Sequence, residues 1–395
     1  MSWTSLDGGK TWLFEPSEEA NAGNAFSFLG RVWEGILRAE DSALRAQLSD
    51  LIQGAEEFRQ GKAETINGLS HREALEVTLT RPYSEFPQWI GQQGLELLAY
   101  RDDTAHVDKD YAPFYFDRPW NYEQRTIALT ATTKRSVSLQ SIHFIVEPDR
   151  HKQFELYKAG KLDTCNLTPD DLAIVREDPE LSKHLHEFDT AASLVGFIDL
   201  HAHPWGNSQF MDKTPLRAAV NHALTREAMG ESLGFTPWPH LLPKALKQYI
   251  DPPLLGTPTY GLEPDLEAAQ EGERLAGHDQ ASLLPLNMLL SYVDDPLLEQ
   301  LAINVKDNLD DISIRMRPFP CKTREDALKL VEIGSMDIWL QWIYPAYQSP
   351  DAFFYPTLHS SLYGLGGNYG MLKDPEIDEM IEKAQAAPTE AARAK

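Results

Sequence analysis

The last third of the sequence alternates between short apolar runs and longer segments of helical periodicity, and this alternation restricts the folds open to the chain. Runs of strand length come at 284–291, 312–318 and 337–342. Between them, apolar residues repeat at helical spacing over 295–309 and 323–333. Strands and helices in this alternation predict an α/β domain, in which helices cover a sheet.

The first hundred residues have a different character, because strands and helices are mixed there. Two Trp-containing runs flank Asp7, Gly8 and Gly9, which predicts a hairpin over 3–14. The following segments predict a helix over 25–37, a helix over 49–61 that ends at Gly61, and a strand over 74–79. This region is therefore expected to be α+β.

The middle of the chain predicts a small set of strands with one helix. The pattern indicates strands over 125–131 and 138–146, a helix over 149–157 closed by Gly160, and a short strand over 163–166. Strand, helix and strand in that order suggest a crossover unit.

A further helix is expected from Thr214, because Thr is a good capping residue and Pro215 suits the first helical position. An apolar run just before it ends in His201 and His203, and such a pair at a strand end can aim two imidazoles at one cation. A metal-dependent hydrolase is therefore an alternative function. Further ligands are not evident, since none of the later histidines ends an obvious buried strand, which favours two ordinary histidines. These later residues are His222, His240, His278 and His359.

Composition narrows the class of protein and of partner. The chain has 395 residues, of which 42% are hydrophobic, so it has room for two or three ordered domains. The formal charge of −24 repels phosphate backbones, which predicts that nucleic acid is not a partner. Cys165 and Cys321 lack metal-like spacing, and the sequence leaves open whether they are free or joined.

The sequence also bears on targeting. Met1 is followed by SWTSLDGGKTW rather than by a basic and apolar signal segment, and no run of about 18 apolar residues occurs. As printed, the chain is expected to be soluble and to carry no export address.

Five local strings in a fixed order point to one family. They are SLDGGKTWLF at 5–14, GAEEFRQGKAETINGL at 54–69, FELYKAGKLD at 154–163, LRAAVNHALTREAM at 216–229 and NYGMLKDPEIDEMIEKA at 368–384. Together they resemble the extracellular solute-binding proteins of family 5, the peptide, dipeptide and nickel binding proteins that feed ABC transporters. In this frame the segment with His201 and His203 is a crossing strand before a helix, and the metal site loses most of its support.

The resemblance implies an α/β, two-lobed fold like that of periplasmic binding proteins of type II, cluster C. Mixed sheets flanked by helices are expected, with an extra α+β subdomain. The implied divisions are the subdomain at 1–115, part of lobe I at 116–205 and lobe II at 206–395. Family members begin earlier and continue further, so this chain is expected to be a fragment, the product of an unusual gene model or a shortened relative. Missing strands would leave sheet edges that favour instability or self-association.

The resemblance also implies a function without chemistry. The chain is expected to capture a peptide or other small solute in an inter-lobe cleft, to deliver it to the membrane permease of an ABC transporter, and to act as a monomer without cofactor or metal. A periplasmic or extracellular location follows from the resemblance, whereas the missing signal peptide leaves a cytoplasmic location open. An intracellular ligand-sensing lobe of a regulator is the nearest variant.

The predicted ligand-binding residues are Trp342, Tyr344, Tyr347, Trp339 and Asp351. The resemblance places the stretch 342–350 at the cleft, where peptide-binding relatives carry an Asp that this chain replaces with Ala346. The anchor for a peptide amino group is therefore expected to be absent. Asp351 is the candidate that could replace it from a shifted position, and a merely solvated loop carboxylate is the alternative. Alternation along 338–343 puts the two Trp side chains on opposite faces of a strand, and aromatic residues at a strand end suit stacking on a ligand. Such a lining fits an apolar or sugar-like solute better than a free dipeptide.

Overall fold

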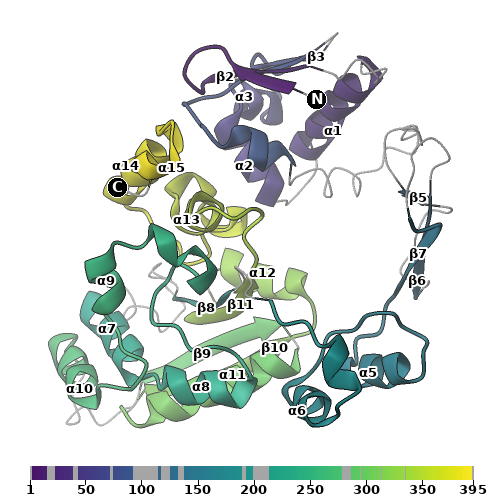
Figure 1. The fold of residues 1–395 in the computed structure, drawn as a ribbon. Helices are drawn as coiled ribbons and strands as arrows, with labels where there is room; N and C mark the ends of the chain where they lie inside the picture. The colour runs from purple at the N-terminus through teal and green to yellow at the C-terminus, as the bar shows by residue number, and fades with distance from the viewer. Residues whose placement is uncertain are drawn as a thin grey trace. The chain divides into compact units, whose positions relative to one another are not determined.

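The structure is a computed structural model that divides into two compact units, formed by residues 1–100 with 189–395 and by residues 101–188. It describes residues 2–15, 23–38, 43–71, 74–91, 114–116, 125–131, 138–188, 193–198, 213–277, 286–293, 295–312, 314–333 and 335–393. Figure 1 shows the labelled elements, and each unit is described by itself. The predicted divisions at residues 115 and 205 stay a prediction.

The first unit is built around a four-stranded sheet with the order β10-β9-β11-β8. Strands β9, β10 and β11 run parallel, and β8 is antiparallel to β11. Their bounds are β8 Ser193–Ile198, β9 Leu286–Val293, β10 Ile314–Cys321 and β11 Ile338–Ile343. The last three agree with the predicted strands to within three residues, so the predicted α/β region is confirmed.

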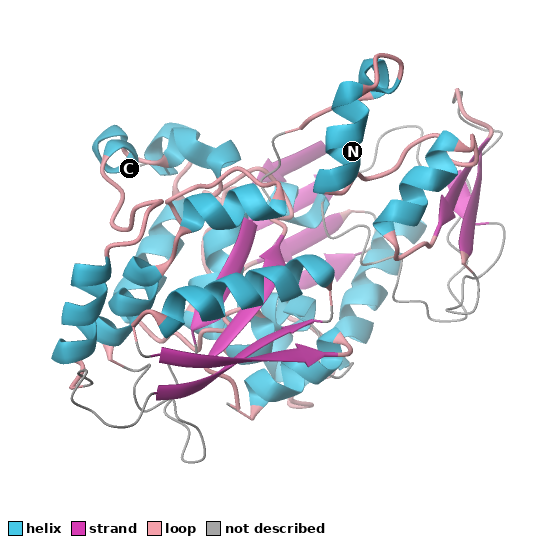
Figure 2. Cartoon of the chain, turned by 90° about the horizontal axis from the view of Figure 1, so that it is seen from below, coloured by secondary structure: helices cyan, strands magenta, loops and turns pink. Residues whose placement is uncertain are grey.

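Helices cover both faces of this sheet, and Figure 2 shows them around its strands. One face packs on helices α7 (Thr214–Ala223), α8 (Arg226–Leu233), α10 (Leu266–Leu275) and α11 (Pro296–Asp310). The opposite face packs on α12 (Arg324–Glu332). Trp342 belongs to the first core and Trp339 to the second, which confirms the predicted alternation along β11. A connection through η3 (Lys244–Tyr249) and α9 (Pro252–Gly256) joins α8 to α10.

The N-terminal part of the same unit carries a second sheet, of order β1-β2-β4-β3. Its elements are β1 Ser2–Ser5, β2 Thr11–Glu15, α1 Gly23–Arg38, α2 Ala43–Leu51, α3 Ala55–Arg59, β3 Leu69–His71 and β4 Leu75–Thr78. The predicted hairpin is present, and Gly8 and Gly9 take positive φ values in its turn. The α+β character of this region is therefore confirmed.

The C-terminal helices complete the core of that N-terminal part. They are α13 (Asp351–Leu358), the short turns η4 (Ser360–Leu362) and η5 (Gly364–Gly366), α14 (Pro375–Ala386) and α15 (Glu390–Arg393). Tyr355, Leu362 and Ile381 are buried in one cluster with Trp33, Leu48 and other residues of the first ninety. Segments more than 260 positions apart in sequence thus share one hydrophobic core.

Two local predictions in this unit were wrong. The helix expected over 49–61 is two helices, because Gly54 takes a left-handed conformation and the chain between them pairs with the end of β4. Thr214 does not cap α7. It is the first helical residue, Lys213 is at the cap position, and the Thr214 hydroxyl accepts a hydrogen bond from Arg217 at 3.0 Å.

The second unit contains an antiparallel sheet of β5 (Phe114–Phe116), β6 (Thr126–Ala131) and β7 (Ser141–Ile145), in that order. Helices α5 (Arg150–Lys158) and α6 (Pro169–Glu177) and the turn η1 (Leu181–His184) follow. The short strand expected over 163–166 is irregular chain, so the described residues of this unit form no crossover. Helix α6 was not predicted, although Thr168 and Asp171 form its capping box.

Candidate ligand-binding site

The carboxyl end of β11 extends past its parallel neighbour. Strand β9 pairs with β11 only at Ile338, Trp339 and Leu340. Trp342 and Ile343 pair with the start of β8 instead. Ligands of open α/β sheets bind outside the carboxyl ends of the strands. The end of β11 and the chain that follows it are therefore the first candidate for a ligand-binding surface.

Three aromatic rings meet at this strand end. Trp342 is half-buried, and its ring lies 5.2 Å from that of Phe235 in an edge-on arrangement. Tyr344 is 69% exposed, and its ring centroid is 6.1 Å from that of Trp342 at a tilt of 31°. We call Phe235, Trp342 and Tyr344 the aromatic shelf. Exposed rings at contact distance offer a stacking surface to an apolar group.

Phe235 was not among the predicted residues, and local backbone geometry explains its position. Gly234 ends helix α8 in a left-handed conformation, and the Phe235 N–H donates to the Gly230 carbonyl at 2.8 Å. A side chain at Gly230 would meet Pro237 at 2.7 Å, so only glycine lets the segment fold back so closely. The Leu-Gly-Phe sequence at a helix end was the available signal.

The structure does not bring all five predicted residues to the shelf. Trp342 and Tyr344 belong to it, whereas Trp339 is fully buried and packs edge-on against Tyr369 at 4.5 Å. The alternation of β11 is the reason, because Trp339 faces α12 on the other side of the sheet. Ligand contact by any of the five residues stays a prediction.

Tyr347 and Asp351 take part in a buried polar cluster with Tyr83. The Tyr83 hydroxyl donates to Asp351 Oδ2 and also contacts the Tyr347 hydroxyl. Tyr347 donates to the same carboxylate oxygen at 2.8 Å. Burial raises the pKa of Asp351, although the two hydroxyls and Gln385 partly offset it. Burial and the nearby carboxylate also raise the pKa of Tyr83, which therefore stays protonated as a donor.

A second buried contact fixes the same loop. Ser349 is 2% exposed and donates to Glu85 at 2.6 Å. Arg393 lies 3.2 Å from the other oxygen of Glu85. Burial raises the pKa of Glu85, and both Ser349 and Arg393 act against that shift. The loop between β11 and α13 is thus attached to residues 83 and 85 at several points.

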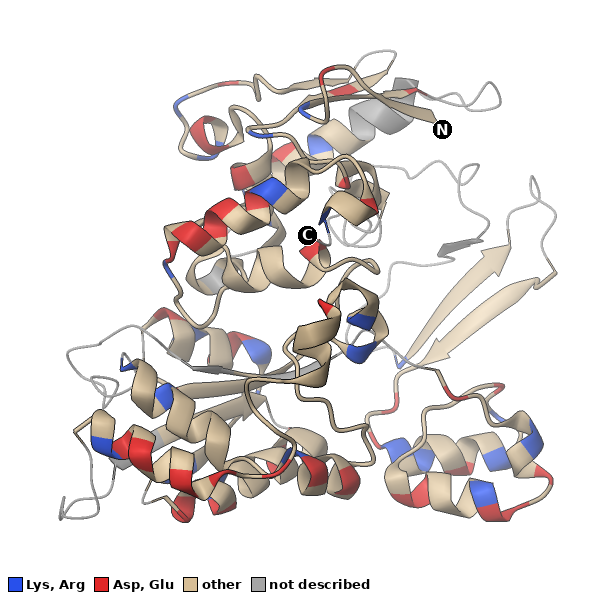
Figure 3. Ribbon diagram, turned by 60° about the vertical axis from the view of Figure 1, so that its left-hand side comes forward, with Lys and Arg blue, Asp and Glu red and all other residues tan. Residues whose placement is uncertain are grey.

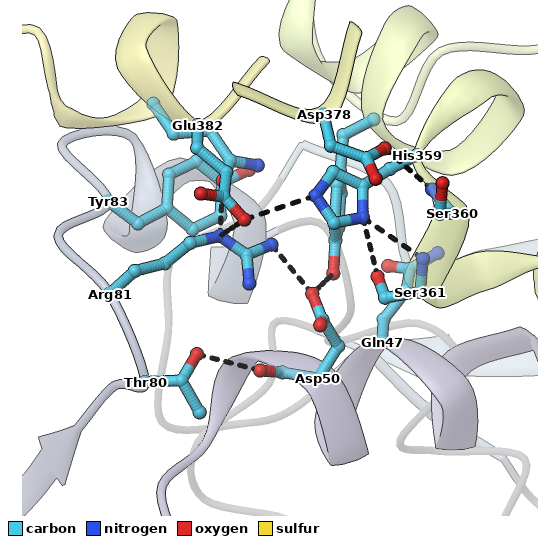
Figure 4. A network of polar contacts seen from close by, with 12 residues as sticks. Gln47, Asp50, Thr80, Arg81, Tyr83, His359, Ser360, Ser361, Asp378 and Glu382 are labelled. Carbon is cyan, nitrogen blue, oxygen red and sulfur yellow. Dashed lines mark hydrogen bonds and ion pairs between the residues drawn. The ribbon is translucent and has the colours of Figure 1, made fainter. Parts of the chain in front are cut away.

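A third polar cluster lies beside these two and is shown in Figure 4. Arg81 is 2.6 Å from Asp50, and Tyr355 donates to the same oxygen of Asp50 at 2.6 Å. His359 lies between Ser361, at 2.7 Å, and Glu382, at 3.4 Å. Burial acts to raise the pKa of Asp50, but the hydrogen bond and charge of Arg81 outweigh it, and the pKa is below its ordinary value.

A hollow of about 570 Å³ lies between α2, α3 and the segment that follows α13. Asp50, Glu56, Arg59 and Tyr363 are among its lining residues. Arg59 pairs with Glu56, and Asp50 pairs with Arg81, so these charges already have partners. None of the five predicted ligand-binding residues lines this hollow.

The metal alternative finds no support in the described part of the chain. His201, His203 and His278 lie outside the described residues. Within the described ranges, no group of three or more His, Cys, Asp or Glu residues is placed to hold a metal ion. Cys165 and Cys321 are both free thiols. No described helix is long and apolar enough to cross a membrane.

Charged residues are distributed rather than gathered near the shelf. Figure 3 shows Asp and Glu spread over many helices, with Lys and Arg between them. Neighbouring charges along the helices form exposed pairs such as Lys306 with Asp310 and Lys383 with Glu379. Exposed pairs of this kind contribute little to stability. They leave the aromatic shelf as the more distinctive surface.

Comparison with protein families gives one match. The model of the bacterial extracellular solute-binding proteins, family 5 Middle, matches residues 64–364. That range includes Tyr83, Phe235 and the whole loop after β11. No curated protein matches the sequence.

Solved structures of two-lobed binding proteins are similar in fold. The periplasmic oligopeptide-binding protein OppAIV of Borrelia burgdorferi has a TM-score of 0.75 at 17% identity, over 100% of this chain and 79% of that chain. The murein tripeptide binding protein MppA of Escherichia coli has a TM-score of 0.76 at 17% identity, with the same coverages. OppA of Haemophilus influenzae, in complex with the peptide RPPGFSPFR, has a TM-score of 0.72 at 18% identity, again over 100% and 79%.

Proposed function

Because the chain belongs to the bacterial extracellular solute-binding proteins of family 5, we propose that it captures a peptide-like solute on the aromatic shelf for import by an ABC transporter. The shelf carries this proposal. Phe235, Trp342 and Tyr344 present rings at the carboxyl edge of the sheet, with Tyr344 largely exposed. Stacking and apolar contact with such rings suit a solute that carries an aromatic or aliphatic side chain.

The similar structures support a peptide rather than another small solute. Their titles name oligopeptide and murein tripeptide binding proteins, and one is a complex with a nonapeptide that contains two Phe residues. The net charge of −24 favours a neutral or cationic solute over an anionic one. The proposed partners are therefore such a peptide and the membrane permease of the transporter.

The remaining features of the proposal follow from this role. The protein acts as a monomer outside the cytoplasm, in the periplasm or the extracellular space, and it performs no reaction and needs no cofactor. Trp342 and Tyr344 contact the solute, together with Phe235. Trp339, Tyr347 and Asp351 hold the end of β11 and its loop in place, because their polar and aromatic groups contact other buried residues.

An equimolar pool of tripeptides Ala-X-Ala, with X covering the twenty amino acids, tests the proposal by native mass spectrometry. We expect the protein to retain members in which X is Phe, Trp, Tyr or Leu. Trp342→Ala should weaken binding of Ala-Phe-Ala by about tenfold, the loss of roughly 1.4 kcal/mol of stacking.

Trp3→Ala is the matched control, because Trp3 is 56% exposed on β1 and is not part of the shelf. The control should bind as the unaltered protein does. If the protein retains no tripeptide, the proposal that its ligand is a peptide is wrong. If Trp342→Ala binds Ala-Phe-Ala as tightly as the unaltered protein does, the aromatic shelf is not the binding surface.

A further inference from the structure

We infer that Tyr83 and Glu85 are positioning residues for the ligand-binding surface, although they lie about 260 positions before it in the sequence. They hold the loop 344–350, which connects strand β11 to helix α13. The inference rests on the proposed function, because that function makes the shelf at the start of this loop the binding surface. Neither residue is proposed to touch the ligand.

The loop lacks a regular backbone structure that would fix its shape. Pro345 and Pro350 have no N–H to donate. Within 344–350, whose residues are all described, the Ser349 N–H donates to the Tyr347 carbonyl at 2.9 Å, and no second backbone bond joins residues of the loop. Side-chain contacts must therefore determine its conformation.

Those side-chain contacts come from residues 83 and 85. Tyr83 contacts the hydroxyl of Tyr347 and the carboxylate of Asp351, and Glu85 accepts from Ser349. Tyr83 is 0% exposed, so water does not compete with its two contacts. The three attachment points follow one another at every second residue, from 347 to 351. They restrain the second half of the loop.

The anchor is itself rigidly held. The Tyr83 N–H donates to the Gly9 carbonyl at 2.9 Å, and the indole of Trp12 donates to the Tyr83 carbonyl at 3.2 Å. The Ser84 N–H donates to the Gln385 carbonyl at 2.8 Å. The strands of the N-terminal hairpin and helix α14 thus fix the segment that in turn fixes the loop.

The exposed end of the loop depends on this anchor. Tyr344 is three residues before Tyr347, so the Cα atoms of the two residues are at most about 11 Å apart. With Tyr347 fixed by Tyr83, the range open to the Tyr344 ring is limited, and it lies over Trp342. Preorganisation of this kind raises affinity because less conformational entropy is lost on binding.

Tyr83→Phe tests the inference, since it removes one hydroxyl and keeps the ring in the core. The matched control is Tyr355→Phe, which removes a buried hydroxyl from the same core, where it donates to Asp50 rather than to the loop. Each change removes the buried contacts of one hydroxyl, two for Tyr83 and one for Tyr355, so both should lower stability. The two variants differ in the contact that is lost: the Tyr83 hydroxyl contacts Tyr347 and Asp351 at the loop, whereas the Tyr355 hydroxyl contacts Asp50.

The first measurement is hydrogen exchange, without ligand, of the Ser349 and Asp351 amides, which donate to the Tyr347 carbonyl and to the Ser349 hydroxyl. We expect Tyr83→Phe to speed exchange there about tenfold and Tyr355→Phe to leave it unchanged. The second is binding of Ala-Phe-Ala, which Tyr83→Phe should weaken about fivefold while Tyr355→Phe does not. Glu85→Gln keeps an acceptor for Ser349, so its exchange rate and its affinity for Ala-Phe-Ala should lie between those of Tyr83→Phe and Tyr355→Phe.

The outcomes separate the inference from the proposed function. If exchange in the loop is the same in both variants, Tyr83 does not position it and the inference is overturned. If exchange rises only in Tyr83→Phe but no variant or parent binds a tripeptide, the loop is held as inferred and the proposed ligand is wrong. If both variants weaken binding equally, the effect is general destabilisation, which also overturns the inference.

Discussion

Two buried tyrosines in one core each donate a hydrogen bond to a buried carboxylate, yet the two carboxylates differ in charge balance. Tyr355 donates to Asp50, which has Arg81 at 2.6 Å. Tyr83 donates to Asp351, which also accepts from the Tyr347 hydroxyl. The pKa of Asp50 is lowered and that of Asp351 is raised. Direct contact with Arg81 decides the direction of the pKa shift. Arg81 bonds to Asp50, whereas it acts on Asp351 only through its charge, and this charge and the hydroxyl donors together do not offset burial.

The difference suggests different roles for the two clusters. The Asp50 cluster is an ion pair that joins α2 to the chain after β4, and breaking it leaves a buried charge. The Asp351 cluster is a set of hydroxyl contacts that orients a loop at the proposed site. The first should matter more for stability and the second more for the position of the loop.

The largest effect should come from Asp50→Asn, which removes the close ion pair of the buried Arg81 guanidinium and leaves it only the longer contact with Glu382 at 3.9 Å. We expect a loss of about 3 kcal/mol in the free energy of unfolding at pH 7, measured by urea denaturation. The lowered pKa means that the carboxylate contributes stability above the ordinary carboxyl range, and that this contribution is lost as pH falls through the folded pKa. The variant should therefore approach the parent as pH falls below about 4.

A loss below about 1 kcal/mol at pH 7 would contradict the comparison, because the pair would then behave as an exposed one. Lys306→Ala is a control for such a pair, since its partners Asp307 and Asp310 are exposed on α11. It should change stability by less than about 0.5 kcal/mol.

An intermediate effect is expected at a third buried acid, Glu273 in α10. Burial raises the pKa of Glu273 to about 7. A raised pKa contributes stability that is fully present below the unfolded pKa and lost as pH rises through the folded value. Glu273→Gln should therefore be more stable than the parent by roughly 2 kcal/mol at pH 8.5, and this advantage should shrink toward pH 4.5.

Thermal unfolding at several pH values checks this expectation. Glu271→Gln is the matched control, because Glu271 lies in the same helix but is exposed and pairs with Arg274. Glu271→Gln should not be more stable than the parent at pH 8.5. A variant of Glu273 that is less stable than the parent at pH 8.5 would show that the buried carboxylate is stabilised in its charged form, as Asp50 is.

The contrast between regions also explains how much the sequence could predict. The elements from β9 to β11 were predicted nearly in full, because apolar periodicity is a local signal and each element shows it by itself. The polar clusters were not predicted. Tyr83 and Asp351 are separated by 268 positions, and no local pattern indicates that their side chains meet.

The candidate site was predictable in part for the same reason. Aromatic residues at the end of a strand are visible in the sequence, which predicts Trp342 and Tyr344, and the structure places both on one surface. Phe235 belongs to a different helix end, and its contact with Trp342 depends on tertiary packing. Asp351 looked like a solvated carboxylate that could serve a ligand, but the structure buries it.

The smallest effect on stability should come from Asp351→Asn. The amide keeps an acceptor for Tyr83 and Tyr347 and removes a buried charge, so we expect a change within about 1 kcal/mol at pH 7 by urea denaturation. The raised pKa of Asp351 means that its contribution is fully present below the unfolded pKa and is lost as pH rises through the folded pKa. The parent should thus gain stability relative to the variant on acidification, the reverse of the Asp50→Asn result.

The two difference curves against pH, from about pH 3 to pH 8, therefore slope in opposite directions if Arg81 is what separates the two clusters. Curves that slope the same way would show that Asp351 is also held as a carboxylate, and that the hydroxyls of Tyr83 and Tyr347 suffice without a cation in direct contact. In that case the loop would be fixed by a charged group, and Asp351→Asn should speed hydrogen exchange of the Ser349 amide as strongly as Tyr83→Phe does.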